Sequence, residues 1–294
     1  MNSEPDWDLY RTFLAVVQEG SLSRAARRLG LTQPTVARHV DALERSVGAD
    51  LFLRSQRGLT PTEIALELQP HAETLALDAA RLWRTASGRP GEARGSVRVS
   101  AGEIIGVEHL PPILTQLRRR HPGLVVELVL SNALDDLLRR EADIAVRMVE
   151  PAQEALVARR LPPIRVGLHA RRDYLDRRGT PRTLEDLAEH DLIGFDRETP
   201  AMRAIHARYP MLGRGAFALR ADSDLAQLAA VRAGFGIGVC QVPIARKDPA
   251  LVRVLEAEFA IDYGLWVVMH EDLKTSARCR VTFDALVAGL QGIG

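Results

Sequence analysis

Residues 21–43 read SLSRAARRLGLTQPTVARHVDAL, and this stretch predicts two short helices joined by a tight turn at Gly30. Thr32 is suited to cap the second helix. Pro34 is compatible with that helix because the N–H groups of a first turn have no intrahelical partners. The order and spacing are those of a helix-turn-helix, although short matches to this pattern also occur in ordinary helical hairpins.

The second helix divides into an apolar face and a polar face. Val36, Val40 and Leu43 fall on one side, which predicts that they are buried. The opposite face and the N-terminal end suit contacts with base edges and phosphates in a major groove, through an amide, a hydroxyl and a guanidinium. The candidate DNA contacts of this helix are Thr32, Gln33, Pro34, Thr35 and Arg38.

Residues 51–63 read LFLRSQRGLTPTE and predict a small two-stranded wing. Arg54 and Arg57 near its tip are candidates for the minor groove or for phosphates, and the alternative is a solvated hairpin. Residues 21–57 hold seven arginines against three acidic residues, a local net charge of +4, whereas the whole chain carries +1. Basic charge is therefore concentrated on the expected DNA-binding segment.

A long amphipathic helix is predicted for residues 62–88. Small and large apolar residues recur along it at steps of three and four, and the leucines of this stripe are Leu68, Leu75 and Leu82. Such a stripe predicts a homodimer through paired helices, with packing against the chain's own domain as the alternative. Pro70 removes one internal hydrogen bond and is expected to bend the helix.

Composition limits the class of protein. The 294 residues are 46% hydrophobic and 26% charged, with no apolar run long enough to cross a bilayer, and the N-terminus lacks the apolar core of a secretion signal. We therefore expect a cytoplasmic protein without a membrane partner. Neither cysteine stands in a metal-ligand spacing and the eight histidines are scattered, so no metal and no cofactor are expected.

Residues 88–95, GRPGEARG, form a loop rich in glycine, proline and charge, where we place a domain boundary. Strand-like and helix-like segments alternate from residue 96 onward, with helices predicted to begin at His109 and Asn132 and a strand predicted to begin at Ile164. This alternation predicts an α/β domain with mostly parallel strands. Two lobes fit this length better than one.

The N-terminal motif with its wing resembles the LysR-type transcriptional regulators, and the remaining chain has the length and segment order of that family's effector domain. The resemblance implies an α+β multidomain chain: a winged helix-turn-helix at 1–61, a linker helix at 62–88 and a two-lobed effector-binding domain at 89–294, similar to periplasmic binding proteins. It implies two crossings between lobe I (95–163 and 267–294) and lobe II (164–266). It also implies a homodimer or homotetramer that binds double-stranded DNA and contacts RNA polymerase. Ala37 stands where the family often has serine.

Ligands of open α/β sheets bind beyond the carboxyl ends of strands. By the resemblance, residues after three predicted strands line an effector cleft between the lobes. Arg147 is suited to pair with an acidic effector, and a surface salt bridge is its alternative role. The candidate effector residues are Ala101, Gly102, Glu103, Ser131, Asn132, Arg147, Phe195 and Phe235.

These observations predict a sequence-specific DNA-binding regulator controlled by a small molecule, and not an enzyme. The sequence has no nucleophile elbow, clustered metal ligands or cofactor fingerprint. A regulator without an inducer remains open as an alternative, as does an enzyme built on the two lobes.

Overall fold

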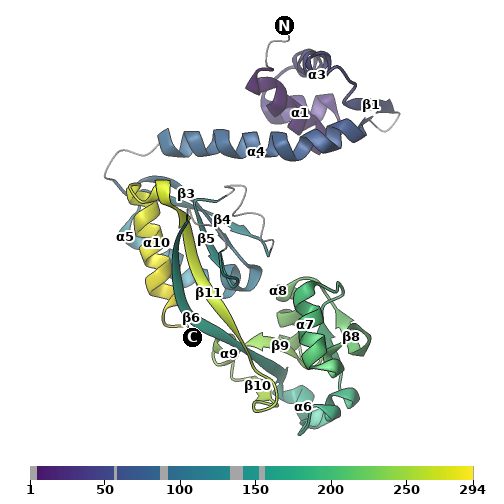
Figure 1. The fold of residues 1–294 in the computed structure, drawn as a ribbon, viewed down its shortest axis with the longest axis vertical. Helices are drawn as coiled ribbons and strands as arrows, with labels where there is room; N and C mark the ends of the chain where they lie inside the picture. The colour runs from purple at the N-terminus through teal and green to yellow at the C-terminus, as the bar shows by residue number, and fades with distance from the viewer. Residues whose placement is uncertain (1–4, 56–57, 87–91, 133–141, 152–155, 294) are drawn as a thin grey trace. The chain divides into compact units, whose positions relative to one another are not determined.

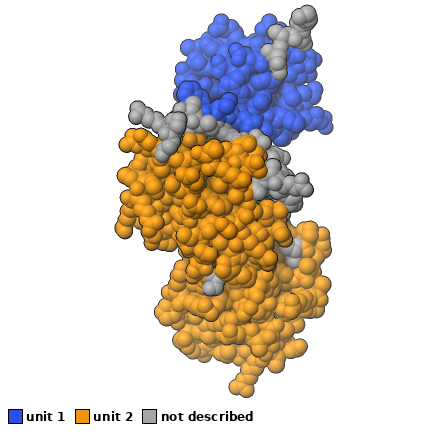
Figure 2. All heavy atoms as spheres, turned by 60° about the vertical axis from the view of Figure 1, so that its left-hand side comes forward, with its two compact units in different colours: residues 1–86, 139–141 blue, residues 87–138, 142–294 orange. Residues whose placement is uncertain are grey.

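The computed structural model describes residues 5–55, 58–86, 92–132, 142–151 and 156–293, which form two compact units, residues 1–86 with 139–141 and residues 87–138 with 142–294 (Figure 2). Within the described ranges, no helix combines the length and apolar composition needed to span a membrane. The helix predicted after Asn132 lies outside the described residues.

The first unit is the predicted winged helix-turn-helix followed by a long helix (Figure 1). The turn at Gly30 has a φ of 67°, which is the left-handed conformation that glycine adopts without strain. The antiparallel pairing of the two wing strands confirms the predicted hairpin. The elements of this unit are α1 (Trp7–Glu19), α2 (Leu22–Leu29), α3 (Gln33–Val47), β1 (Phe52–Ser55), β2 (Gly58–Pro61) and α4 (Glu63–Ala86).

The core of the first unit confirms the predicted faces of α3. Val36, Val40 and Leu43 are buried together with residues of α1 and α2. The first half of α4 also belongs to this core, since Ala65 and Ala72 are buried in it and Leu68 packs against it. For Leu68 the structure therefore favours the alternative role, packing within its own chain.

The second unit is built on a seven-stranded sheet in the order β10-β6-β11-β5-β3-β4, with β9 also paired to β6. Strands β3 (Gly95–Ala101), β4 (Leu124–Leu130) and β5 (Ile144–Arg147) pair in parallel, as predicted. Helices α5 (Leu110–Arg120) and α10 (Ala277–Leu290) lie side by side against this part of the sheet and complete the core of lobe I.

Two long strands join the lobes, β6 (Leu156–Arg171) and β11 (Ile261–His270), and they pair antiparallel along their length. The expected lobe boundaries, 163/164 and 266/267, fall inside these strands. The prediction of mostly parallel strands is wrong for this region, because β5, β6, β9, β10 and β11 form antiparallel pairs.

A proline pair explains why β6 was predicted to begin only after it. The register of β6 against β11 shifts so that Pro162 and Pro163 lie opposite the single residue Gly264. Proline cannot donate to a strand ladder, and a bulge is one of the few places where a sheet tolerates it. Strand β6 therefore continues through two prolines that, from the sequence alone, predict the end of a strand.

Lobe II surrounds the far ends of these strands, and its buried residues form two clusters. The sequence did not predict α6, α7, α9 or β10. The remaining elements are α6 (Arg172–Arg178), β7 (Leu192–Gly194), α7 (Pro200–Arg208), β8 (Phe217–Arg220), α8 (Asp224–Arg232), β9 (Gly238–Gln241), α9 (Val242–Ala245) and β10 (Leu251–Val254). Helix α5 is preceded by a π-helical turn, Ile105–His109, where the sequence predicted a helix only from residue 109.

Candidate nucleic-acid interface and ligand cavity

The N-terminal end of α3 presents a set of ordered polar groups. Thr32 is the N-cap residue, and its hydroxyl oxygen accepts a hydrogen bond from the backbone N–H of Thr35 at 3.3 Å. The Ser23 hydroxyl of α2 donates to the amide oxygen of Gln33 at 2.9 Å. Arg38 is exposed one turn further along. The predicted contacts of the helix therefore share one accessible surface, as a groove-reading helix requires.

The wing is attached to the helices by backbone contacts. Leu59 N–H donates to the carbonyl oxygen of Gly20 at 2.9 Å, and a Cβ on Gly58 would lie 2.5 Å from that same oxygen. The Glu44 carboxylate accepts from the N–H groups of Leu51 and Phe52 at 2.7 and 3.2 Å. These contacts hold β1 and β2 beside α1 and α3. Arg54 lies in β1 and its side chain is outside the described part, as is the whole of Arg57.

The second unit contains a cavity of about 410 Å³ between the lobes, a size typical of small-molecule sites. Three of the predicted effector residues line it: Gly102, Asn132 and Phe195. Most of the wall is apolar and comes from elements that the sequence did not bring together. Lining residues that sequence reasoning missed include Met202, Phe217, Val239, Asp224 and Tyr263.

The other predicted effector residues do not line the cavity. Ala101 is buried in β3, and its carbonyl oxygen accepts from the N–H of Ser131 at 2.9 Å. Arg147 is buried, and its guanidinium donates to the Ser100 hydroxyl at 2.6 Å. Its burial argues against the surface salt bridge, and it is not among the residues that line the cavity. Phe235 is exposed and does not line the cavity either.

Glu103 takes part in a polar network that includes the lining residues Asn132 and Asp224. Its backbone N–H donates to the Asn132 amide oxygen at 3.0 Å, and its carboxylate accepts from the Ser223 hydroxyl at 2.8 Å. The Asn132 amide nitrogen donates to the Asp224 carboxylate at 2.9 Å. Lobe I is thereby tied to the N-terminus of α8 in lobe II.

Two further contacts join the lobes behind the cavity. Arg232 of α8 donates two hydrogen bonds to the Glu108 carboxylate, at 2.7 and 2.8 Å, and these bonds lower the pKa of Glu108. The His109 imidazole is hydrogen-bonded to the Gln241 amide oxygen at 2.8 Å, and burial lowers the pKa of His109. Glu108 and His109 belong to the π-helical turn, so this turn is a second place where lobe I contacts lobe II.

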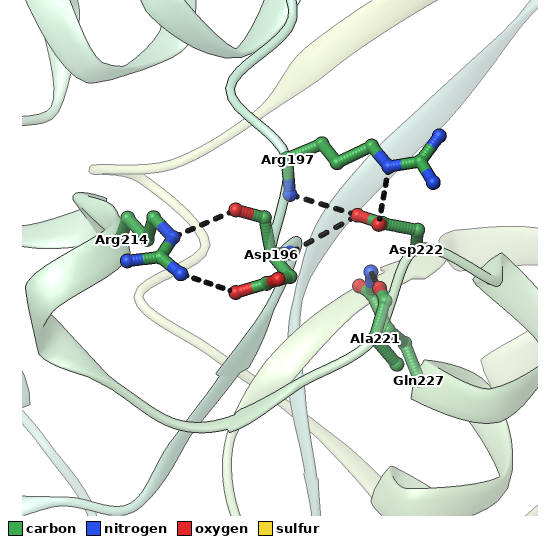
Figure 3. Close-up of polar contacts among 6 residues, drawn as sticks. All are labelled: Asp196, Arg197, Arg214, Ala221, Asp222 and Gln227. Atoms are coloured by element: carbon green, nitrogen blue, oxygen red, sulfur yellow. Dashed lines mark hydrogen bonds and ion pairs between the residues drawn. The ribbon is translucent and has the colours of Figure 1, made fainter.

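A second network, drawn in Figure 3, involves the residues that directly follow Phe195 in the chain. The Asp222 carboxylate accepts from the backbone N–H groups of Asp196 and Arg197 at 3.1 and 2.9 Å. Arg214 donates to both the backbone and the side chain of Asp196, at 2.8 and 2.7 Å. The residues that follow β7 are therefore fixed in position, which orders the adjoining Phe195.

The cavity offers little for covalent chemistry. Cys240 lines it, but burial raises the pKa of this thiol to about 12. A thiol with this pKa is not ionised near neutral pH, and the thiolate is the reactive form. Among the described residues, no group of histidine, cysteine and acidic side chains is arranged to hold a metal ion.

Comparison with known proteins assigns the family. Residues 7–66 match the bacterial regulatory helix-turn-helix of the lysR family, and residues 90–291 match the LysR substrate-binding domain. The chain therefore belongs to the LysR family and is a LysR-type DNA-binding transcriptional regulator with an effector-binding domain.

Individual relatives agree with this assignment. The chain is 31% identical to a probable HTH-type transcriptional regulator, LtrA, of Klebsiella pneumoniae, over 97% of this chain and 94% of that one. It is 27% identical to the HTH-type transcriptional activator TtdR of Escherichia coli, over 99% and 96% of the two chains. Because these relatives are named as transcriptional regulators, the comparison favours a role without catalysis.

The fold matches solved structures over almost the whole chain. The LysR-type regulator CrgA from Neisseria meningitidis gives a TM-score of 0.60 at 25% identity, covering 98% of this chain and 99% of that one. Full-length CbnR, solved in complex with its target DNA, gives a TM-score of 0.67 at 19% identity, covering 96% and 99%. At 19% identity, the similarity to CbnR shows a shared fold.

Proposed function

We propose that this protein is a transcriptional regulator whose DNA binding responds to a small molecule held between the lobes of the second unit. The observation that carries the proposal is the cavity of about 410 Å³, whose walls come from both lobes and whose lining residues Asn132 and Asp224 are hydrogen-bonded to each other between the lobes. A ligand shifts a conformational equilibrium only when it binds two states with different affinity. A molecule that fills this space contacts both lobes, so its affinity differs between two arrangements of the lobes.

The operator-reading surface in this proposal is the exposed end of α3 together with the wing. Gln33 and Thr35 contribute base contacts, and Arg38, Arg54 and Arg57 contribute base or phosphate contacts. Selection of duplexes from a random pool by the full-length protein tests this part. We expect recovery of a preferred sequence at moderate salt, and the absence of any preference would contradict it.

We further propose that two chains pair through the second half of α4. Leu75, Leu82 and Trp83 are 46%, 73% and 78% exposed in the single chain. Exposed apolar side chains that adjoin one another mark an interaction surface. A homodimer places two DNA-reading helices on one duplex, and association of dimers gives a homotetramer. An effector that changes the arrangement of the readers then alters contact with RNA polymerase.

A cavity-filling variant tests the effector response. Val239 lines the cavity and is 39% exposed, whereas Val107 is 41% exposed and does not line it. A reporter placed behind a mapped operator is read over a panel of carbon sources. We expect variable output from the wild type and Val107→Trp, and constant output from Val239→Trp. Equal variation in all three contradicts the proposal, and constant output from the wild type favours a regulator without an inducer.

A further inference from the structure

The lining of the cavity identifies the chemistry of a ligand that would fill it. Most of its wall is aliphatic or aromatic, with side chains from both lobes. A ligand with an apolar body removes this surface from water, which stabilises the complex. Residues that contribute such surface are Ile104, Phe195, Met202, Phe217, Val239 and Ile261.

The described lining of the cavity carries one carboxylate, that of Asp224, and neither lysine nor arginine is part of it. His206 is the histidine of this lining, and its Nδ1 lies 3.5 Å from the Glu198 carboxylate. Asp224 accepts a hydrogen bond from the Asn132 amide at 2.9 Å, and the Glu103 carboxylate is bound to the adjacent Ser223 at 2.8 Å. Two carboxylates therefore lie close enough to interact, and each accepts a hydrogen bond from a neutral donor.

The N-terminus of α8 does not turn this part of the cavity into a site for an anion. A helix N-terminus attracts anions through its free N–H groups. Here the Ser223 hydroxyl already accepts from the Ala226 N–H, and the first residue of the helix is Asp224 itself. A carboxylate ligand approaching this end would meet the Asp224 carboxylate before it met a free donor. Repulsion between like charges at short range disfavours such a ligand.

The titration of neighbouring groups agrees with an electronegative site. Burial raises the pKa of Asp224, and the charge of Glu103 acts in the same direction. Burial and the charge of Asp224 raise the pKa of the Tyr263 phenol, which also lines the cavity. A cation placed among these groups would replace the water that Asp224 loses on burial.

We infer that the effector is an amphipathic amine, with an apolar body enclosed by the lobes and an ammonium group that donates to Asp224. The inference rests on the proposed function of the cavity and adds the class of ligand. It excludes the acidic effector that Arg147 suggested, because Arg147 is buried against Ser100. An ammonium beside Asp224 also lies near Asn132 of lobe I, so the charged end contacts both lobes.

Matched ligands test the inference on the full-length protein. Phenethylamine, phenethyl alcohol and phenylacetate share one apolar body, and tryptamine, tryptophol and indole acetate share a larger one. Titration calorimetry near neutral pH is expected to rank amine above alcohol above carboxylate, with the amine about tenfold or more tighter than the alcohol. Equal binding of amine and alcohol, tighter binding of the carboxylate, or no binding in either series overturns the inference.

Asp224→Asn removes the charge and keeps the size of the side chain. We expect this variant to lose the preference for the amine and to bind the alcohol as before. Asp284→Asn on α10 is the control, because it makes the same change of charge at an exposed residue outside the lining, and it should retain the preference. If Asp224→Asn also retains it, Asp224 is not the partner of the amine. The ranking of amine, alcohol and carboxylate is measured on the wild type, so it tests the ligand class even if a variant fails to fold.

The same titrations separate this inference from the proposed function. Operator affinity is measured by fluorescence anisotropy with and without each ligand. Amines that bind in the expected order without changing operator affinity contradict the proposed function and support the ligand class. Carboxylates that bind more tightly and do change operator affinity support the proposed function and overturn the ligand class.

Discussion

The Ser23 hydroxyl on α2 donates a hydrogen bond to the Gln33 amide oxygen, at 2.9 Å, across the turn of the helix-turn-helix. This contact joins the two helices and fixes which end of the amide carries its free donors. The first helix therefore orients the Gln33 amide, the group that we propose contacts a base.

Gln33→Ala should relax base preference at one operator position by about 1–3 kcal/mol, because a two-bond contact with one base is lost. Ser23→Ala should give a smaller loss at the same position, since the amide stays but is no longer oriented. Competition binding with operators substituted at each position measures both effects. Unchanged preference in Gln33→Ala would remove the residue from the interface.

Arg38→Ala should weaken operator binding and reduce the dependence of log affinity on log salt by about one unit if the guanidinium neutralises a phosphate. Arg182→Ala is the matched control, because Arg182 is exposed in the second unit. Anisotropy over a range of salt concentrations measures the slopes. A slope shared by wild type and Arg38→Ala, together with equal affinity, contradicts the assignment.

Glu44→Ala should lower the free energy of unfolding of the first unit by about 1–3 kcal/mol, because the N–H of the fully buried Leu51 loses its acceptor. Glu44→Gln should cost less, since an amide oxygen can still accept. Urea unfolding measures the change, and operator affinity reports whether the wing is displaced. Equal stability of Glu44→Ala and the wild type would show that the contact contributes nothing.

Leu75→Asp should dissociate the oligomer, because an ionised side chain would enter the paired apolar surface of α4. Leu66→Asp is the control: Leu66 is 54% exposed on α4, and nine residues at about 100° each place it on the opposite face from Leu75. Sedimentation velocity measures the oligomer. Parental mass in Leu75→Asp would contradict pairing through this face.

The second unit should lose stability as the pH falls from 6.5 to about 4. Burial lowers the pKa of His169 from 6.5 to about 4, although its hydrogen bond to the Gly167 carbonyl opposes this shift. Arg253 lowers and Glu256 raises the same pKa. Between these pH values the unfolded chain binds a proton that the folded chain does not. The free energy of unfolding therefore falls with decreasing pH, by about 3 kcal/mol in total.

Comparing the wild type with His169→Gln isolates this contribution from other titrating groups. The wild type should have the steeper dependence, by up to about 1.4 kcal/mol per pH unit within the window. Urea unfolding followed at several pH values, on the transition of the second unit, measures it. Parallel curves for the two proteins would show that His169 does not titrate differently on folding.

The DNA-binding end was predictable from sequence because its signals are local. The buried Val36, Val40 and Leu43 repeat at helical spacing, Thr32 caps the helix that follows it, and Gly30 marks the left-handed turn. Each of these features depends on residues a few positions apart. Sequence also led to the family, since the motif and the wing occur at a characteristic separation.

Features that depend on contacts between distant segments could be identified only in the tertiary structure. Leu68 and Leu75 belong to one sequence stripe, but the first packs on its own domain and the second is exposed, since the core reaches only part of α4. Strand β6 passes through Pro162 and Pro163 because they form a bulge opposite the single residue Gly264 of β11.

The cavity is the clearest case. Asn132 and Asp224 are separated by ninety-two positions and meet across the lobes. Local periodicity carries no information about such a meeting, since it arises from the packing of whole elements and from the burial that packing imposes.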